Sequence, residues 1–307
     1  MGKYAISKEY ALCRLFKAPA GNAKVASFFG SFLKTPKRLF RDPEMDARRI
    51  TIPGYGGDEI EILLFSPGSL DSDAPCLVYF HGGGFLFPAA GPQYDVAVRY
   101  AKETPCKLVF VQYRLTPKHR FPIPVEDCYC GWKWTYDNAG QLGIDRKKIA
   151  VGGDSAGGCL AAAVSLMARD RSGIKPRFQL LVYPVTDRRM ETASQKNYTD
   201  TPMWNSRLSE KMWQAYLPEK DFAEIAYASP MEAASFEDLP DAYVETAQFD
   251  CLHDEGIGFA KALEKAGVPV TVNETEGTVH GYDVITKAPT TQKSIAARIA
   301  YMREKFR

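Results

Sequence analysis

The feature that most constrains the fold is an alternation of short apolar runs with helix-length segments, from about residue 74 onward. The apolar runs are rich in Val, Tyr, Phe and Ile, and they span 76–80, 107–114, 148–153, 178–184, 241–247 and 268–274. Several lack polar alternation, which is typical of strands buried on both faces of a parallel sheet. Helix-length segments lie near 92–103, 124–139, 155–171, 252–267 and 288–305. This pattern predicts an α/β fold with a mostly parallel sheet flanked by helices.

A hairpin is predicted ahead of these units. The stretch RRITIPGYGGDEIEILLFSP, residues 48–67, carries Ile or Leu at every second position on either side of a Gly-rich turn. A period of two around such a turn indicates two antiparallel strands. We therefore expect eight strands, with the hairpin at one edge of the sheet.

Two segments interrupt the alternation. Residues 1–45 are predicted to be helical and amphipathic, and residues 186–230 insert a loop and a helix over 206–217. Insertions after the carboxyl end of a strand lie over the ligand crevice of such sheets. We expect both segments to form a cap, although the insertion could instead be an apolar cluster packed on the core. No linker divides the chain, so 1–307 is predicted to be a single domain.

Composition and charge give no sign of a nucleic-acid or membrane partner. Hydrophobic residues make up 45% and charged residues 25% of the 307 residues, which is ordinary for a soluble globular protein. The net charge is +2, and the densest basic run is residues 34–41. We read that run as a solvated segment and predict no nucleic-acid partner.

The amino terminus lacks the apolar core of a signal peptide, and no stretch has membrane-spanning length. We expect no stable membrane anchor and a cytoplasmic location.

The cysteines and histidines do not suggest a metal site. Seven cysteines occur at irregular spacings without a C-x-x-C pair, and the four histidines are far apart in sequence. Zinc sites need clustered Cys and His ligands. We predict buried free thiols, no metal and no cofactor.

The stretch VGGDSAGGC, residues 151–159, surrounds one serine with very small residues directly after a predicted strand. Residues 153–157 match the G-x-S-x-G pattern of a nucleophile elbow, where a sharp turn from strand to helix exposes the serine oxygen. Such a turn needs residues that tolerate unusual backbone angles and close backbone contact. Ser155 is the predicted nucleophile, and it requires a base, an acid and oxyanion donors.

The stretch YFHGGGF, residues 79–85, is the candidate oxyanion loop. Successive glycines after a strand can turn backbone N–H groups toward one point, and the residue after the nucleophile supplies a further donor. The predicted donors are Gly83, Gly84 and Ala156. Nearby aromatic residues are candidates for a substrate pocket, with plain packing as the alternative: Phe85, Phe87, Trp204 and Trp213.

The base and the acid follow from chain order. In enzymes with this elbow the nucleophile precedes the acid, and the acid precedes the histidine. His280 lies just after the last predicted strand, whereas His119 lies in a Pro-bounded loop and His253 at a helix start. Asp250 stands at a strand end, and Asp254 lies in the following helical turn. We assign His280 as base, Asp250 as acid and Asp254 as a supporting carboxylate.

Six motifs together resemble the hormone-sensitive-lipase family of α/β-hydrolases, in its bacterial acetyl-esterase and carboxylesterase branch. In family order they are HGGGF, YRLTPKHRFPIPVEDC, GGDSAGG, LLVYPVTD, FDCLHDEG and GTVHGY, between about residues 74 and 282. The resemblance implies a serine esterase that cleaves short- to medium-chain acyl esters without a cofactor. It implies the same nucleophile, base, acid and oxyanion donors.

The acid loop departs from the family pattern. Cys251 stands where the family usually has Pro, His253 where it has Arg, and Gln248 where it has a small residue.

Two alternative functions remain at this point: a non-catalytic small-molecule receptor, and an amidase or peptidase with the same triad. Relatives that are receptors lack the histidine, so His280 weighs against the first. Homodimerisation through an edge strand also stays open.

Overall fold

A computed structural model of the chain describes residues 3–16, 30, 32–68, 70, 72–218 and 224–307. An eight-stranded sheet runs through it in the order β1-β2-β4-β3-β5-β6-β7-β8. The strands are β1 Met45–Pro53, β2 Glu59–Pro67, β3 Ala74–Phe80, β4 Lys107–Gln112, β5 Ile144–Asp154, β6 Gln179–Val182, β7 Ala242–Phe249 and β8 Val270–Val279. β2 pairs antiparallel with both β1 and β4, and every other pairing is parallel. The predicted mostly parallel sheet with a hairpin at one edge is confirmed.

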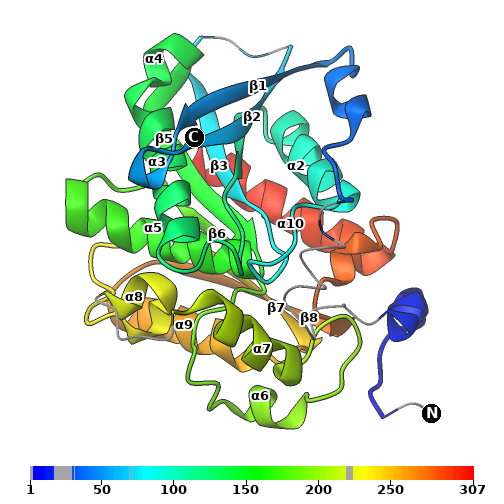
Figure 1. Cartoon of the computed structure of the whole chain (residues 1–307). Coiled ribbons are helices and arrows are strands. Elements are labelled where there is room, and N and C mark those ends of the chain that lie inside the picture. The colour runs from blue at the N-terminus through cyan, green and yellow to red at the C-terminus, as the bar shows by residue number, and fades with distance from the viewer. Residues whose placement is uncertain (1–2, 17–29, 31, 69, 71, 219–223) are drawn as a thin grey trace.

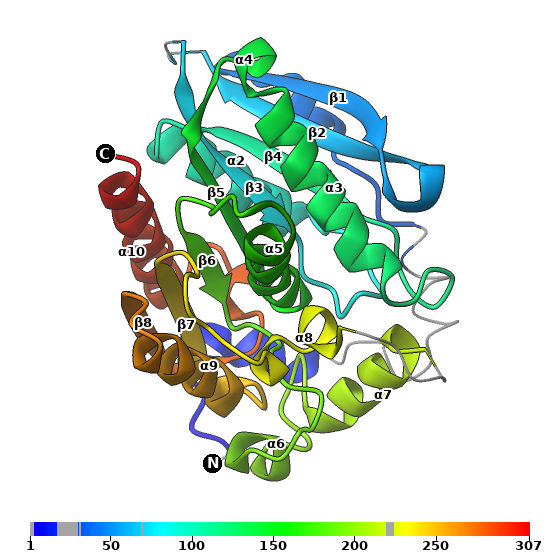
Figure 2. The same ribbon diagram turned by 90° about the vertical axis from the view of Figure 1, so that its left-hand side faces the viewer.

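Helices cover both faces of the sheet (Figures 1 and 2). Helices α3, α5 and α9 lie on one face, and α2 and α10 lie on the other. The α-helices are α2 Gly91–Glu103, α3 Ile123–Asp137, α4 Ala139–Leu142, α5 Ala156–Ser172, α6 Ala193–Asn197, α7 Ser206–Tyr216, α8 Ile225–Ala228, α9 His253–Lys265 and α10 Pro289–Lys305. The long ones match the predicted helical segments, including the one expected over 206–217. In the described part of the chain, no helix is both long and apolar enough to cross a bilayer.

The two layers of core follow from the alternation of side chains along each strand. In β3, Val78 and Phe80 pack in the cluster under α3, α5 and α9, whereas Leu77 and Tyr79 pack in the cluster under α2 and α10. All four side chains are almost fully buried. Strands buried on both faces explain why the sequence showed continuous apolar runs rather than alternation.

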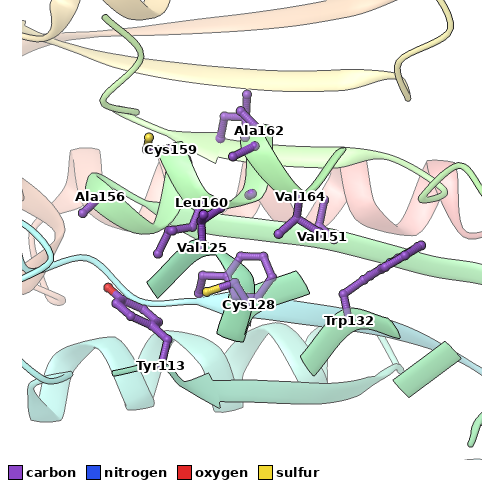
Figure 3. Close-up of a cluster of buried hydrophobic side chains, with 14 of the residues drawn as sticks. Tyr113, Val125, Cys128, Trp132, Val151, Ala156, Cys159, Leu160, Ala162 and Val164 are labelled. Carbon is purple, nitrogen blue, oxygen red and sulfur yellow. The ribbon is translucent and has the colours of Figure 1, made fainter. Parts of the chain in front are cut away.

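Helix α5 occupies the centre of the first layer because its side chains are small. Alanines and glycines fill much of its buried surface, and Figure 3 shows Leu160 and Val164 packed with Cys128 and Trp132 of α3. At Gly157, a Cβ atom would collide with the carbonyl oxygen of Phe80 in β3. The glycines after Ser155 therefore let the start of α5 lie directly against the sheet.

The amino-terminal segment differs from the predicted run of helices. Its described residues form two 3-10 helices, η1 Lys8–Leu15 and η2 Lys37–Phe40, while 17–29 and 31 lie outside the described residues. Tyr10 has non-helical backbone angles, and η1 has no side-chain cap. Short uncapped segments gain too few hydrogen bonds to sustain an α-helix.

The amino-terminal segment nevertheless lies beside the insertion, as expected for two parts of a cap. The N–H of Met203 donates to the carbonyl of Phe16 at 3.2 Å, which joins the two segments. The N–H of Ser7 donates to the carbonyl of Gly277 at 2.9 Å, at the end of β8. The amino-terminal segment thus lies near the carboxyl end of β8.

Candidate active site

Ser155 occupies the sharp turn between β5 and α5. Its backbone angles are φ 57° and ψ −118°, a left-handed conformation that is unusual for a residue with a side chain. Its N–H donates to the carbonyl of Val182 at 2.8 Å, which holds the turn against β6. Strained backbone of this kind is concentrated at functional sites. The turn places the serine hydroxyl at the carboxyl edge of the sheet, as the motif predicted.

The three predicted triad residues form one hydrogen-bonded chain. His280 Nε2 lies 2.8 Å from Ser155 Oγ, and His280 Nδ1 lies 2.6 Å from Asp250 Oδ2. Asp250 is fully buried, and its second oxygen accepts the Leu252 N–H at 2.9 Å. Because a carboxylate only accepts, Nδ1 carries the ring proton, and Nε2 is left to accept the serine proton. This geometry can deprotonate a serine hydroxyl.

Neighbouring strands bring the base and the acid together. Asp250 directly follows β7, and His280 directly follows β8. These strands are adjacent and parallel, so their carboxyl ends lie at the same edge of the sheet. Gln248 reinforces this edge, because its side-chain oxygen accepts the Gly277 N–H at 2.7 Å. The residue that departs from the family pattern at 248 therefore ties the acid loop to the histidine loop.

Asp254, predicted as a supporting carboxylate, has other partners. One oxygen lies 2.8 Å from His253 Nδ1, and the other accepts the Ser194 N–H at 2.8 Å. His253 Nε2 also lies 3.0 Å from a Glu274 oxygen. Within the described residues, Asp254 makes no hydrogen bond to His280. It supports the acid loop from outside the triad, and His253 has the local hydrogen-bonding role that its position predicted.

The Gly-rich loop after β3 presents two of the predicted oxyanion donors. Gly83 has φ 123° and Gly84 has φ 60°, which glycine adopts at little cost. The N–H groups of Leu86 and Phe87 both donate to the Gly83 carbonyl at 3.0 Å, forming a tight turn. In the part of the chain that the structure describes, the Gly83 and Gly84 N–H groups have no protein acceptor. Both can therefore donate to a ligand.

Ala156 is the first residue of α5, so its N–H has no acceptor one turn earlier in the helix. Helix amino termini favour negative charge because their free N–H groups point outward along the axis. The N–H next to Ser155 thus has the character that an oxyanion donor needs.

Sequence reasoning missed Asp154, which connects the elbow to the Gly-rich loop. Its carboxylate accepts the Gly82 N–H at 3.0 Å, the Tyr79 hydroxyl at 2.8 Å and the Gln93 amide at 2.8 Å. Burial raises the pKa of this carboxyl, and the nearby Asp283 raises it further. The available signal was an acidic residue within an otherwise small and apolar motif.

His81 opens the Gly-rich loop, and it is structural. Its Nδ1 lies 2.7 Å from the Gly82 carbonyl, and its ring stacks on Tyr113 with centroids 4.4 Å apart. The Tyr113 hydroxyl donates to the His81 carbonyl at 2.7 Å. Burial lowers the pKa of His81 to about 4, so the imidazole is neutral at physiological pH.

We predict that His81 stays neutral from pH 8 down to about pH 5. The unfolded chain binds a proton near pH 6.5 that the folded His81 excludes until about pH 4. This residue therefore makes the free energy of unfolding fall as the pH drops through that window. Histidine ¹H–¹⁵N NMR spectra, assigned with His81→Gln, would check this. A His81 titration midpoint above pH 6 would contradict it.

The predicted aromatic residues fall into two groups. The ring of Trp204 lies beside Gly84 and 6.2 Å from the His280 ring, and Phe87 is half-buried next to Gly83. Phe85 is fully buried and stacks on Tyr216 at 3.9 Å, with Trp213 packed at 6.4 Å. The structure thus brings Trp204 and Phe87 to the Gly-rich loop, whereas Phe85 and Trp213 pack in the core behind it.

A second buried network, which the sequence did not predict, supports the histidine. The Tyr183 ring packs edge-on to the His280 ring at 4.8 Å. The Tyr183 hydroxyl donates to Asp283 at 2.6 Å, and Asp283 accepts Arg298 of α10 at 2.8 Å. Arg298 is 1% exposed and also pairs with Glu245 of β7. This chain of contacts connects the carboxyl-terminal helix to the catalytic face.

Comparisons with known proteins agree with this geometry. A family model described as an alpha/beta hydrolase fold matches residues 77–284. The chain is 33% identical to the carboxylesterase NlhH of Mycobacterium tuberculosis, over 81% of this chain and 79% of that protein. It is 32% identical to an arylesterase of Saccharolobus solfataricus, over 86% of this chain and 84% of that protein.

Solved structures extend the similarity to the whole fold. A bacterial heroin esterase superposes with a TM-score of 0.89 at 33% identity, covering 99% of this chain and 98% of that chain. Sheet order, motifs and relatives all agree, and the relatives are esterases. The chain belongs to the hormone-sensitive-lipase family of α/β-hydrolases and is a serine esterase.

Proposed function

We propose that the protein hydrolyses carboxylic esters with short to medium acyl chains, through Ser155, His280 and Asp250 and an acyl-enzyme intermediate. The observation that carries the proposal is the continuous hydrogen-bonded chain from Asp250 through His280 to Ser155, with links of 2.6 and 2.8 Å. Nucleophile and base within this distance, with the base oriented by a third group, are the signature of nucleophilic catalysis.

In the proposed mechanism, Ser155 Oγ attacks the ester carbonyl carbon while its proton passes to His280 Nε2. Asp250 holds the imidazole in the required tautomer and stabilises the imidazolium that forms. The N–H groups of Gly83, Gly84 and Ala156 stabilise the negative oxygen of the tetrahedral intermediate. The intermediate collapses, the C–O bond to the alcohol breaks, and His280 protonates the departing alcohol. Water, deprotonated by His280, then releases the acid and restores Ser155.

The preference for shorter acyl chains is supported by Trp204. Its side chain is 6% exposed, and its indole N–H donates to Ser209 at 2.9 Å. The ring is thereby held beside Gly84, where the carbonyl end of a substrate would lie. A bulky ring fixed at that point limits the width of the adjacent acyl site.

The test is steady-state hydrolysis of 4-nitrophenyl esters from acetate to palmitate, with 4-nitroacetanilide as the matched amide. We expect the highest kcat/KM among the acetate to hexanoate esters, a steep fall toward palmitate, and slower cleavage of the anilide. A folded protein that cleaves no ester would refute the proposal. Faster cleavage of the anilide than of the acetate would instead favour the amidase alternative.

A further inference from the structure

A cavity of about 530 Å³ lies between the amino-terminal segment and the insertion. Its apolar wall includes Ile6, Phe16, Met203 and Leu208. The hydrogen bond from Met203 to Phe16 joins the two segments at this wall. The cavity is large enough for part of a small organic ligand. Neither Ser155 nor His280 lines this cavity, but residues next to its wall contact the catalytic centre.

The cavity adjoins the loop that carries His280. The Met203 methyl group lies 3.7 Å from the point where a Cβ on Gly281 would be, and Gly281 follows His280. Trp204, next in sequence to Met203, packs against the His280 ring. In a serine esterase the histidine protonates the departing alcohol. The cavity therefore lies next to the residue that would protonate the departing alcohol.

The charges at the cavity are strongly unbalanced. Four cations line it, namely Lys3, Arg14, Arg207 and Lys211, against one carboxylate, Asp200. Asp200 already accepts the Lys3 ammonium at 2.7 Å and the Tyr4 hydroxyl at 2.5 Å.

Among the described residues, the other three cations, Arg14, Arg207 and Lys211, form no salt bridge. Arg14 donates to the Ile6 carbonyl at 3.2 Å, and Arg207 interacts with Asp200 only at longer range. Arg207 and Lys211 are exposed and four residues apart on α7, so they lie on the same face of that helix. An apolar wall beside several unpaired cations is complementary to a ligand with an apolar body and an anionic end.

We propose that this cavity binds the alcohol part of the ester and that this alcohol carries an anionic group, such as a carboxylate or a phosphate. The inference rests on the proposed function and adds the substrate class to it. The exposed cations attract the anion over a distance of about a Debye length, so salt weakens the preference. The esterase acts faster on such a substrate than on its uncharged counterpart.

The experiment compares 3-(4-acetoxyphenyl)propanoate with its methyl ester. Two methylene groups separate the charge from the phenol, so the two leaving groups are chemically alike. We expect kcat/KM to be about tenfold higher for the anion in low salt, which corresponds to roughly 0.7 kcal/mol from each of two exposed cations. In about 1 M salt, where the Debye length is about 3 Å, the two substrates should converge.

Arg207→Gln/Lys211→Gln is the test variant, and it should lose the preference while retaining activity on the methyl ester. The matched control is Lys261→Gln/Lys265→Gln, which removes two exposed cations at the same spacing on α9. Both variants lower the net charge equally, so only a local effect distinguishes them. The control should keep the preference.

Equal kcat/KM for the two substrates in wild type, or a preference that Arg207→Gln/Lys211→Gln retains, would overturn the inference and leave the esterase proposal intact. So would a charge preference found only in the acyl part, measured with 4-nitrophenyl hemiadipate and its methyl ester. Binding of the product 3-(4-hydroxyphenyl)propanoate, followed by calorimetry in the same variants, tests the cavity without turnover. If wild type also fails on 4-nitrophenyl acetate, the proposed function itself has failed.

Discussion

Replacement of Ser155 by Ala should lower kcat on 4-nitrophenyl acetate by about a million-fold, the loss that removal of the nucleophile causes in serine-triad enzymes. The variant lacks the oxygen that forms the proposed acyl-enzyme, and His280 has no other hydroxyl partner among the described residues. Alanine has the same Cβ, so the strained backbone of the turn is no more costly than with serine. The residual rate should come from binding and the oxyanion donors alone.

The matched control for this variant is Ser172→Ala in the same helix. The Ser172 hydroxyl donates to the Ala168 carbonyl at 2.8 Å, far along α5 from the site. The same hydroxyl accepts the Ile174 N–H at 3.3 Å. Its loss should leave kcat within about twofold of wild type, since it removes only two ordinary hydrogen bonds. Thermal unfolding of both variants would verify that they fold. A well-folded Ser155→Ala protein that retains more than about one per cent of the activity would exclude Ser155 as the nucleophile.

Asp250→Asn should lower kcat by about ten-thousand-fold. The side chain of asparagine can donate to His280 Nδ1 as well as accept from it. Donation places the ring proton on Nε2, where it faces the Ser155 hydroxyl and prevents proton transfer. The fully buried position of Asp250 leaves no room for solvent to restore the correct tautomer.

Asp254→Asn provides the matched comparison, because the two carboxylates lie four residues apart and only one touches His280. We expect kcat for Asp254→Asn within about fivefold of wild type, with some loss of stability from its contacts to His253 and Ser194. For both variants, kcat is measured as a function of pH, and the residual rate of Ser155→Ala is subtracted. If the two variants lost kcat equally, the assignment of Asp250 as the acid would be wrong, and the losses would reflect a general disturbance of the loop.

Sequence patterns predicted the sheet and the triad because both depend on local signals. Runs buried on two faces mark parallel strands, and a serine among glycines marks a turn that few other residues can form. Chain order then left one histidine in a suitable position. His280 and Asp250 are thirty residues apart, yet both follow a strand, and parallel strands end at one edge of the sheet.

The remaining features depend on tertiary contacts that no local pattern encodes. Phe85 and Phe87 are two residues apart, yet Phe85 is buried because Tyr216 and Trp213 of α7 pack against it. The partners of Asp154 come from β3, the Gly-rich loop and α2, so its role could not be read from its own motif. Residues 8–15 and 37–40 form 3-10 helices rather than the predicted α-helices, because a short polar segment takes its conformation from the surface against which it packs, and the prediction over 17–29 lies outside the described residues.

The contacts that connect Arg298 to His280 have a consequence for synthesis. The nucleophile, the acid and the histidine are all present in a nascent chain before α10 has been translated. Until that helix emerges from the ribosome, however, the buried carboxylates of Glu245 and Asp283 lack their cation, and Tyr183 lacks a fixed partner against the imidazole. Hydrolytic competence should therefore arise only once α10 has folded against the sheet.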